Sequence, residues 1–186
     1  MNLIIGITGA SGITLALRFI DNLPKDIKLY VVFSKSAKLA LKLENEMKIS
    51  TLKSTNKNIT IYNNEEIGQS IASGSFMIDA MIILPCSVNT LAKCRAGISD
   101  TLITRSFSVM LKERKKIILV PREMPYNPIF LENMYKLSKL GVNIAPPVLG
   151  YYSNQKTLKD MEDFLIGKWY DLLDINHNLY KRWNGK

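Results

Sequence analysis

The sequence predicts an α/β protein: a three-layer, doubly wound and mostly parallel sheet with helices on both faces. The first observation behind this prediction is that short apolar, β-branched runs alternate with helical patterns along the whole chain. The second is that several of these runs are continuously apolar, which is typical of strands buried on both faces of a parallel sheet. No repeat, low-complexity segment or linker interrupts the pattern. The 186 residues are therefore expected to form a single domain (1–186), with a C-terminal tail from about residue 174.

The apolar runs and the helical periodicity define the individual elements. Strands are expected at Asn2–Thr8, Lys28–Phe33, Asn58–Tyr62, Ala80–Leu84, Lys116–Val120 and Val142–Ala145. Helices are expected at Ile13–Leu23, Ser36–Met47, Thr90–Ala96, Thr101–Glu113, Pro128–Leu140 and Leu158–Leu173. Pro24 and Gly141 are natural stop signals, and Asp100 and Thr157 are the expected N-caps of the helices that follow them.

Composition argues against export and membrane insertion. No run of eighteen apolar residues is present, so no membrane span is expected, and the apolar start lacks the basic leader of a signal peptide. The chain has two cysteines, Cys86 and Cys94, in a predicted loop and its following helix, which do not form a disulfide framework. A cytoplasmic location is expected.

A formal net charge of +9 raises the possibility of a nucleic-acid partner. The lysines are scattered, however, and the densest cluster, KERKK at 112–116, lies at a predicted helix end, where cations complement the helix dipole. No nucleic-acid recognition motif accompanies them. A solvated basic surface is therefore favoured, with no nucleic-acid partner, while some of the cations are candidates for binding an anionic small substrate.

Small polar residues follow the predicted strands at the points where they end. The segments are TGASG after the first strand, Ser34 after the second, PCSVNT after the fourth, PREMP after the fifth and Pro146-Pro147 after the sixth. In an open parallel sheet all these carboxyl ends lie along one edge, where ligands bind. That edge is the predicted site.

Each motif also has a purely structural explanation. ITGASG gives an anion access to backbone N–H groups at a helix N-terminus, but the same residues suit an ordinary tight turn. PCSVNT has three hydrogen-bonding side chains that could bind phosphate or ring carbonyls, but the same side chains could simply cap the next helix. Arg122 and Glu123 suit either a structural salt bridge or an anion contact beside a proton carrier.

Two other kinds of chemistry fit poorly. A short-chain dehydrogenase needs glycine where Ile13 stands and usually an acidic residue where Ser34 stands, and the YxxxK at Tyr152–Lys156 falls in a predicted loop. Cys86 lacks a histidine to activate it, since the one histidine, His177, is expected on the surface near the C-terminus. No His, Cys or carboxylate spacing fits a metal site.

Five segments occur in order along the chain: ITGASG, VFSKSAKLALKLE, ILPCSVNTLAK, LKERKKIILVPREMP and APPVLGYYSNQKTL. Together they resemble the flavin prenyltransferases of the UbiX type over essentially the whole chain. The resemblance implies a flavodoxin-like, Rossmann-like fold assembled as a homododecamer, with sites where subunits meet. It also implies metal-free transfer of a dimethylallyl group from dimethylallyl phosphate to reduced FMN. The prenylated FMN then passes to a UbiD-type decarboxylase, as in ubiquinone biosynthesis.

The resemblance also assigns roles to individual residues. It places on FMN Gly9, Ala10, Ser11 (near the reacting nitrogen), Ser34, Ser87, Val88, Asn89, Thr90 and Arg122. It places the phosphate of the prenyl donor on Lys112, Tyr152 and Lys168, the last standing where many relatives carry arginine. Glu44 and Glu123 match carboxylates near the reacting centre, and Trp183 matches an aromatic residue that faces a developing allylic cation.

Several of these residues also have a purely structural explanation. Glu44 could form a solvated ion pair with nearby lysines, and Lys112 could complement the dipole at its helix end. Trp183 could pack the C-terminal tail against the body, and Tyr151 could take the position assigned to Tyr152. Two alternative functions also remain. A flavin-dependent cysteine decarboxylase needs a histidine after the first helix, which this chain lacks, and a non-catalytic FMN carrier has no need of the cations together with Tyr152.

Overall fold

The computed structural model describes residues 1–44 and 58–185; within these, the side chain of Glu44 is not described. One six-stranded sheet forms the centre, in the order β3-β2-β1-β4-β5-β6, and every neighbouring pair is parallel. The strands are β1 (Asn2–Ile7), β2 (Lys28–Phe33), β3 (Ile59–Asn63), β4 (Ala80–Cys86), β5 (Lys116–Pro121) and β6 (Asn143–Ile144). The order reverses between β1 and β4, so the carboxyl ends of these two strands diverge into a crevice.

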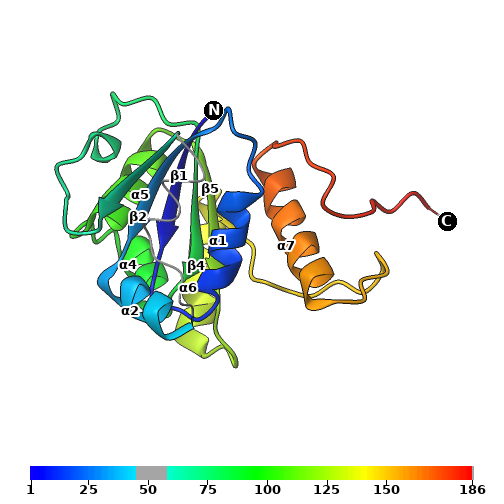
Figure 1. Cartoon of the computed structure of the whole chain (residues 1–186). Coiled ribbons are helices and arrows are strands. Elements are labelled where there is room, and N and C mark those ends of the chain that lie inside the picture. The colour runs from blue at the N-terminus through cyan, green and yellow to red at the C-terminus, as the bar shows by residue number, and fades with distance from the viewer. Residues whose placement is uncertain (45–57, 186) are drawn as a thin grey trace.

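Helices cover both faces of the sheet, which confirms the predicted three-layer, doubly wound architecture (Figure 1). On one face lie α1 (Ile13–Asp21), α2 (Lys35–Glu44) and α7 (Leu158–Leu172). On the other lie α4 (Val88–Ala96), α5 (Leu102–Lys112), α6 (Pro128–Lys139) and the short 3₁₀ helix η1 (Ser70–Ala72). Figure 1 shows α7 beside α1 on the outside of the body; the C-terminal segment passes back beside α7 before its last residues project outward.

The sheet is buried on both faces, as its continuous apolar runs predict. Along β4, Ile82 packs into the core that includes α1 and α7, whereas Met81 and Ile83 pack into the core that includes α5. All three side chains are fully buried. This burial explains why the strands show no alternation of apolar and polar residues.

The predicted boundaries differ from the structure in several places. β4 runs on to Cys86, so Pro85 and Cys86 belong to the strand and not to a loop. β6 has two residues rather than four, η1 was not predicted, and the predicted continuation of α2 over 45–47 lies outside the described residues. Each strand nevertheless lies within about two residues of its predicted position, because the apolar runs are short and well separated.

The expected cap at Asp100 is wrong, because the N-cap of α5 is Thr101. Its hydroxyl accepts a hydrogen bond from the backbone N–H of Thr104, and the Thr104 hydroxyl accepts one from the N–H of Thr101. Asp100 instead forms an ion pair with Lys93 at 2.5 Å. At α7 the expected cap is confirmed: the Thr157 side chain accepts from the N–H of Asp160.

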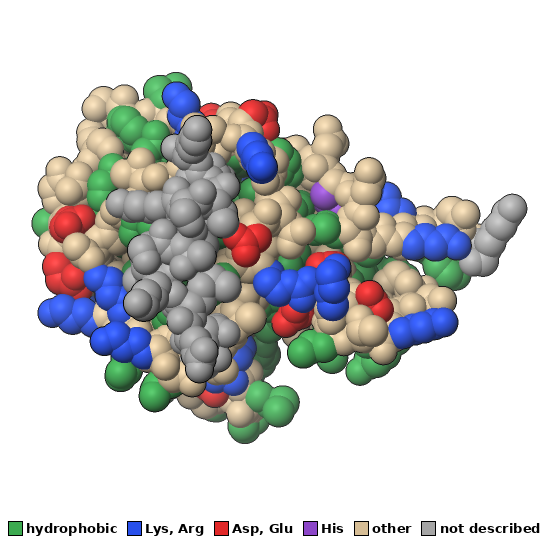
Figure 2. All heavy atoms as spheres, in the orientation of Figure 1, with side chains coloured by type: hydrophobic (Ala, Val, Ile, Leu, Met, Phe, Trp, Pro, Cys, Tyr) green, Lys and Arg blue, Asp and Glu red, His purple; other side chains and the backbone are tan. Residues whose placement is uncertain are grey.

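The described part of the chain has neither a membrane-spanning helix nor, on the face shown in Figure 2, a surface of one charge sign. Within residues 1–44 and 58–185, no helix has the length and hydrophobicity needed to cross a membrane. On the face shown in Figure 2, Lys and Arg side chains are spread over several elements with acidic side chains among them.

Candidate functional site

Thr8 ties the end of β1 to the end of β4. Its hydroxyl donates to the carbonyl of Pro85 at 2.8 Å and accepts from the backbone N–H of Ser87, also at 2.8 Å. Its own N–H donates to the same Pro85 carbonyl at 3.2 Å. Thr8 is 2% exposed, so these bonds are shielded from water. They fix the start of the PCSVNT segment against the TGASG loop at the point where the strand order reverses.

The loop after β2 lies against the loop after β1. The N–H of Ser34 donates to the carbonyl of Ile7 at 3.0 Å, and the Ser34 hydroxyl accepts from the N–H of Ala37 at the start of α2. A Cβ atom on Gly9 would come within 2.2 Å of the Cβ of Ser36, closer than real contacts allow. Glycine is therefore required at position 9 for these two loops to approach each other.

These loops and the start of α4 enclose a polar cavity of about 320 Å³, which we call the rim cavity. Ser87 is the N-cap of α4: its hydroxyl accepts from the N–H of Thr90 at 3.3 Å and lies 3.0 Å from the Thr90 hydroxyl. The cavity is lined by Thr8, Gly9, Ser34, Lys35, Ser36, Asn64, Glu65, Ser87, Asn89, Thr90, Lys93, Thr101, Ile103 and Thr104. Hydroxyls and amides at the start of α4, with Lys35 at the start of α2 and Lys93 in the last turn of α4, suit a phosphorylated ligand with further polar groups.

Five of the nine residues predicted to bind FMN thus line one cavity: Gly9, Ser34, Ser87, Asn89 and Thr90. Ala10 is buried in the adjacent turn, Ser11 in the same turn is exposed, and Val88 is partly buried in the first turn of α4. These three belong to the same loops but do not line the rim cavity.

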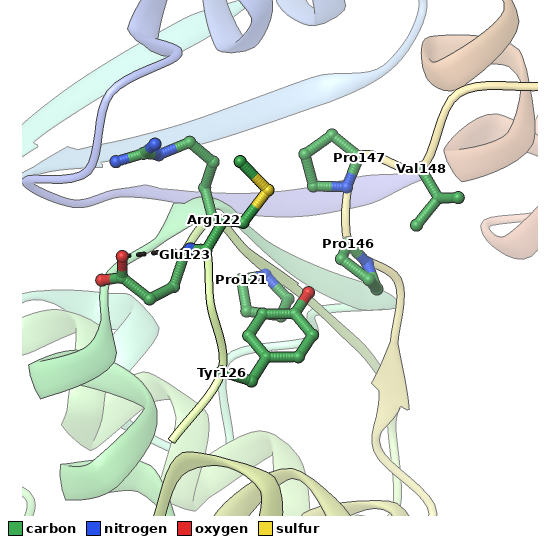
Figure 3. A pocket seen from close by; sticks show the side chains of 8 residues that line it. Pro121, Arg122, Glu123, Tyr126, Pro146, Pro147 and Val148 are labelled. Atoms are coloured by element: carbon green, nitrogen blue, oxygen red, sulfur yellow. Dashed lines mark hydrogen bonds between the residues drawn. The ribbon is translucent and has the colours of Figure 1, made fainter.

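Arg122 and Glu123 lie at a second cavity, of about 470 Å³, which we call the proline cavity. It is lined by Pro121, Arg122, Glu123, Met124, Tyr126, Pro146, Pro147 and Val148 (Figure 3). The backbone N–H of Arg122 donates to the carbonyl of Cys86 at 3.4 Å, so this cavity begins next to the PCSVNT segment.

The two charged side chains of the proline cavity do not pair with each other. Figure 3 shows the guanidinium of Arg122 and the carboxylate of Glu123 as separate groups, and no ion pair joins them in the described part of the chain. A Glu123 oxygen accepts from the N–H of Met124 at 3.1 Å. Both residues are exposed, so Arg122 is available to an anion and the alternative of a structural salt bridge is wrong.

The rings of Tyr152 and Trp183 meet next to Phe164 of α7. Their rings lie 6.4 Å apart at 85°, and the ring of Tyr152 lies 5.5 Å from that of Phe164. Lys168, exposed, is four residues after Phe164 and therefore lies one turn further along that side of the helix. Tyr152 follows Val148 of the proline cavity by four residues, at most about 14 Å of chain. The Tyr152–Lys156 segment is not helical, as predicted.

Lys112 lies at the opposite edge of the sheet from Arg122. It ends α5, whose N-cap, Thr101, lines the rim cavity, and an 11-residue helix spans about 16 Å. Its ammonium forms an ion pair with Glu113, which keeps the pKa of that carboxyl below its usual range. One chain therefore does not bring Lys112 to the other predicted phosphate ligands. The side chain of Glu44, the last residue of α2, lies outside the described residues.

The side chains of Cys86, Cys94 and His177 are all largely shielded from solvent. Cys86 and Cys94 are free and buried; burial raises the pKa of both thiols, that of Cys94 to about 12, which suits packing rather than nucleophilic attack. The expectation that His177 is a surface residue is wrong, since its side chain is 4% exposed beside Asp171. Among the described residues, no group of three His, Cys, Asp or Glu side chains is arranged to hold a metal ion.

Several cavity-lining residues were not predicted. Asn64 is 9% exposed, and its side-chain oxygen accepts from the N–H of Ile103, which joins the end of β3 to the start of α5. Lys35, Glu65 and Lys93 also line the rim cavity. These residues follow β2, follow β3 or lie on the helix after PCSVNT, and this position could have marked them as part of the site. Lysine and glutamate are common on any protein surface, however, so residue type alone did not single them out.

Known proteins match this chain over its whole length. The family described as Flavoprotein matches residues 1–178. The flavin prenyltransferase UbiX of Helicobacter pylori is 47% identical over 184 residues, which cover 98% of each chain. A dodecameric FMN-dependent UbiX-like decarboxylase from Escherichia coli superposes with a TM-score of 0.94 at 37% identity and covers 100% of both chains. AnUbiX, in complex with FMN and dimethylallyl pyrophosphate, has a TM-score of 0.94 at 34% identity and covers 100% of this chain and 98% of its own.

A cysteine decarboxylase is a more distant match. The FMN-dependent cysteine decarboxylase SpaF is 18% identical with a TM-score of 0.62, over 78% of this chain and 83% of its own, so it shares the fold alone. The one histidine of the chain, His177, lies on the C-terminal segment and not after α1. With the polar rim between β1 and β4, the proline cavity beside it and these full-length matches, the chain belongs to the flavoprotein family and, within it, to the flavin prenyltransferases of the UbiX type.

Proposed function

We propose that this chain transfers a dimethylallyl group from dimethylallyl phosphate to reduced FMN, without a metal ion. The observation that carries the proposal is the convergence of Thr8, Gly9 and Ser34 with Ser87, Asn89 and Thr90 on one cavity, next to the cavity that Arg122 and Glu123 line. The full-length similarity to UbiX proteins, one of them in complex with FMN and dimethylallyl pyrophosphate, supports it.

The residues present fit FMN. The rim cavity offers hydroxyl and amide groups with Lys35 and Lys93, a donor set suited to a phosphate, and Gly9 lets the loop after β1 pack closely against Ser36 at the wall of this cavity. Ser34, Ser87, Asn89 and Thr90 are the proposed side-chain contacts, with Gly9, Ala10, Ser11, Val88 and Arg122 completing the set. Reduced FMN, when bound, supplies the electron-rich ring atoms that accept the prenyl group.

The protein side chains handle the departing phosphate. Arg122 places a cation at the proline cavity before charge develops on the leaving group, and Lys168 and Tyr152 add a charge and a hydroxyl on the side of α7. Glu123 holds or accepts a proton at its carboxylate, and Glu44 is a second candidate for this role. The face of Trp183 stabilises positive charge on the allyl group.

Lys112 takes part only if another copy of the chain supplies it. It lies at the far edge of the sheet from Arg122, and the E. coli UbiX-like protein is dodecameric. We therefore propose a homododecamer whose sites are completed by neighbouring subunits. The prenylated FMN would pass to a UbiD-type decarboxylase in the cytoplasm, the setting expected from the two free cysteines.

Anaerobic incubation of the protein with reduced FMN and dimethylallyl phosphate tests the reaction. We expect mass spectrometry to show a flavin heavier by one prenyl unit, and a parallel reaction with dimethylallyl pyrophosphate tests the requirement for the monophosphate. Oxidised FMN serves as the control and should remain unchanged. Unmodified FMN in the complete anaerobic reaction would refute the proposal and would favour the alternative of a non-catalytic FMN carrier.

Mixed oligomers test the shared site. Lys112→Ala and Arg122→Ala should each reduce transfer strongly without lowering the melting temperature, because both side chains are exposed. If the two groups of one site come from different copies, unfolding and refolding the two inactive variants together should restore about a quarter of the activity, since random pairing leaves about that fraction of sites intact. No recovery from a refolded mixture would show that both groups act within one copy.

A further inference from the structure

Three side chains of the C-terminal segment converge on one carboxylate of α7. Asp171 accepts hydrogen bonds from Tyr180 Oη at 2.6 Å, from Arg182 Nη2 at 2.6 Å and Nη1 at 3.2 Å, and from His177 Nε2 at 3.1 Å. The Nδ1 atom of His177 accepts from the N–H of Leu179, so the proton of the ring lies on Nε2, which donates to Asp171. The carboxylate of Asp171 thus binds three side chains of the segment, which span residues 177–182.

The charge of Asp171 is stable in this setting. Partial burial raises its pKa, but the hydrogen bonds from Arg182, Tyr180 and His177 outweigh this and lower the pKa to about 2. Burial and the bond to Asp171 raise the pKa of Tyr180 to about 12. Around neutral pH the carboxylate is therefore ionised and the phenol protonated, as the hydrogen bonds require.

An apolar contact accompanies the polar one. A Cβ atom on Gly167, one turn before Asp171, would come within 2.5 Å of Cδ1 of Tyr180 and 2.7 Å of Cε1 of His177. The segment therefore lies directly on the helix backbone, where a larger residue would push it away. The ring of Tyr180 also lies 5.1 Å from that of Phe164 and 5.5 Å from the guanidinium of Arg182.

Trp183 follows Arg182 directly, so the contacts of Asp171 set where its ring lies. Trp183 is 66% exposed, and its ring contacts that of Tyr152, which itself packs against Phe164. The position of Trp183 therefore depends on the preceding residues of the segment.

We propose that Asp171 is a positioning residue that fixes the C-terminal segment through His177, Tyr180 and Arg182, and so holds Trp183 beside Tyr152 where the prenyl donor binds. This inference rests on the proposed function, because that function gives Trp183 and Tyr152 their roles. Asp171 itself does not touch the donor or the flavin.

Three single variants of the full-length protein, and the double variant of Asp171→Asn and Arg182→Gln, test this. Asp171→Asn removes the charge with little change of shape, and Arg182→Gln removes the cation of the segment. Asp174→Asn is the matched control, since Asp174 lies just beyond the same helix but pairs with Lys116. Trypsin cleavage after the exposed Lys181, followed by mass spectrometry, reports the release of the segment without any need for activity. The KM for dimethylallyl phosphate and the Kd for FMN report the two parts of the site.

We expect cleavage after Lys181 and the KM for the donor each to rise about tenfold in Asp171→Asn, because hydrogen bonds to a charged group are lost. Arg182→Gln should act in the same direction, and the double variant should be no worse than Asp171→Asn alone. The Kd for FMN should stay within about twofold, because the rim cavity does not involve the segment. Asp174→Asn should match the wild type in every measurement.

Unchanged cleavage in Asp171→Asn would overturn the inference. So would faster cleavage with an unchanged donor KM, which would mean that the position of Trp183 does not matter to the donor. Joint loss of FMN binding, assembly and melting temperature would also overturn it, by making Asp171 a folding residue. If the wild type makes no prenylated flavin, the proposed function fails, and the cleavage assay still decides whether Asp171 holds the segment.

Discussion

Replacing Thr8 with valine tests whether the link between β1 and β4 organises the rim cavity. Valine has nearly the shape of threonine but lacks the hydroxyl, which donates to the Pro85 carbonyl and accepts from the N–H of Ser87, both at 2.8 Å. The site is 2% exposed, so water cannot replace the lost groups. The Pro85 carbonyl keeps the N–H of Thr8 as a donor, whereas the N–H of Ser87 loses the partner that Thr8 supplied.

The expected cost follows from these contacts. Losing a buried hydrogen bond costs about 1 kcal/mol, and leaving a buried N–H without a partner costs about 1–3 kcal/mol. The sum is about 3 kcal/mol, which corresponds to a fall of about 6–12 °C in melting temperature for a chain of this size. The start of the PCSVNT segment should also shift, so affinity for FMN should fall by about tenfold or more, the factor that about 1.4 kcal/mol represents.

Thermal unfolding at fixed protein concentration and titration with FMN measure the two effects. Thr8→Ser is the matched control, because it keeps the hydroxyl and loses one methyl group, worth about 1 kcal/mol. Thr8→Ser should therefore bind FMN like the wild type and melt only a few degrees lower. If Thr8→Val melts within about 2 °C of Thr8→Ser, less than about 1 kcal/mol separates them and the hydroxyl does not hold the two strands together.

Two further predictions concern close packing and buried thiols. Gly9→Ala should weaken FMN binding by about tenfold, because its Cβ would lie 2.2 Å from that of Ser36. In the control Gly12→Ala the new Cβ meets nothing within 4 Å, but the φ of 104° should lower the melting temperature through about 1–2 kcal/mol of backbone strain. Equal FMN affinity in both variants would refute the packing argument. Cys86 and Cys94 should resist alkylation by iodoacetamide at pH 8 in the native protein and react in denaturant, because burial raises the pKa of both thiols and suppresses the thiolate. Mass spectrometry measures the labelling, and rapid labelling of the native protein would contradict this prediction.

The sequence by itself determined the architecture and the edge that carries the site. Continuous apolar runs such as that of β4 place a strand between two helical layers whatever its neighbours are, because both of its faces must be buried. Parallel strands then bring their carboxyl ends to one edge, so Gly9, Ser34 and Ser87 were expected together from chain order alone. Sequence pattern does not always place a cap: the prediction is correct at Thr157 but wrong by one residue at Asp100, because Asp and Thr both suit an N-cap and only the local hydrogen bonds select Thr101.

Only the tertiary structure decided which residues meet at long range. The bonds of Thr8 to Pro85 and Ser87 join segments 77 and 79 residues apart. His177 was expected on the surface because its neighbours in sequence are polar, yet the segment folds back on α7 and buries it against Asp171. Lys112 and Arg122 are ten residues apart in sequence but lie at opposite edges of the sheet, because a strand separates them. Local patterns report burial and direction, whereas contacts between distant segments depend on how the elements pack, and no single segment encodes that.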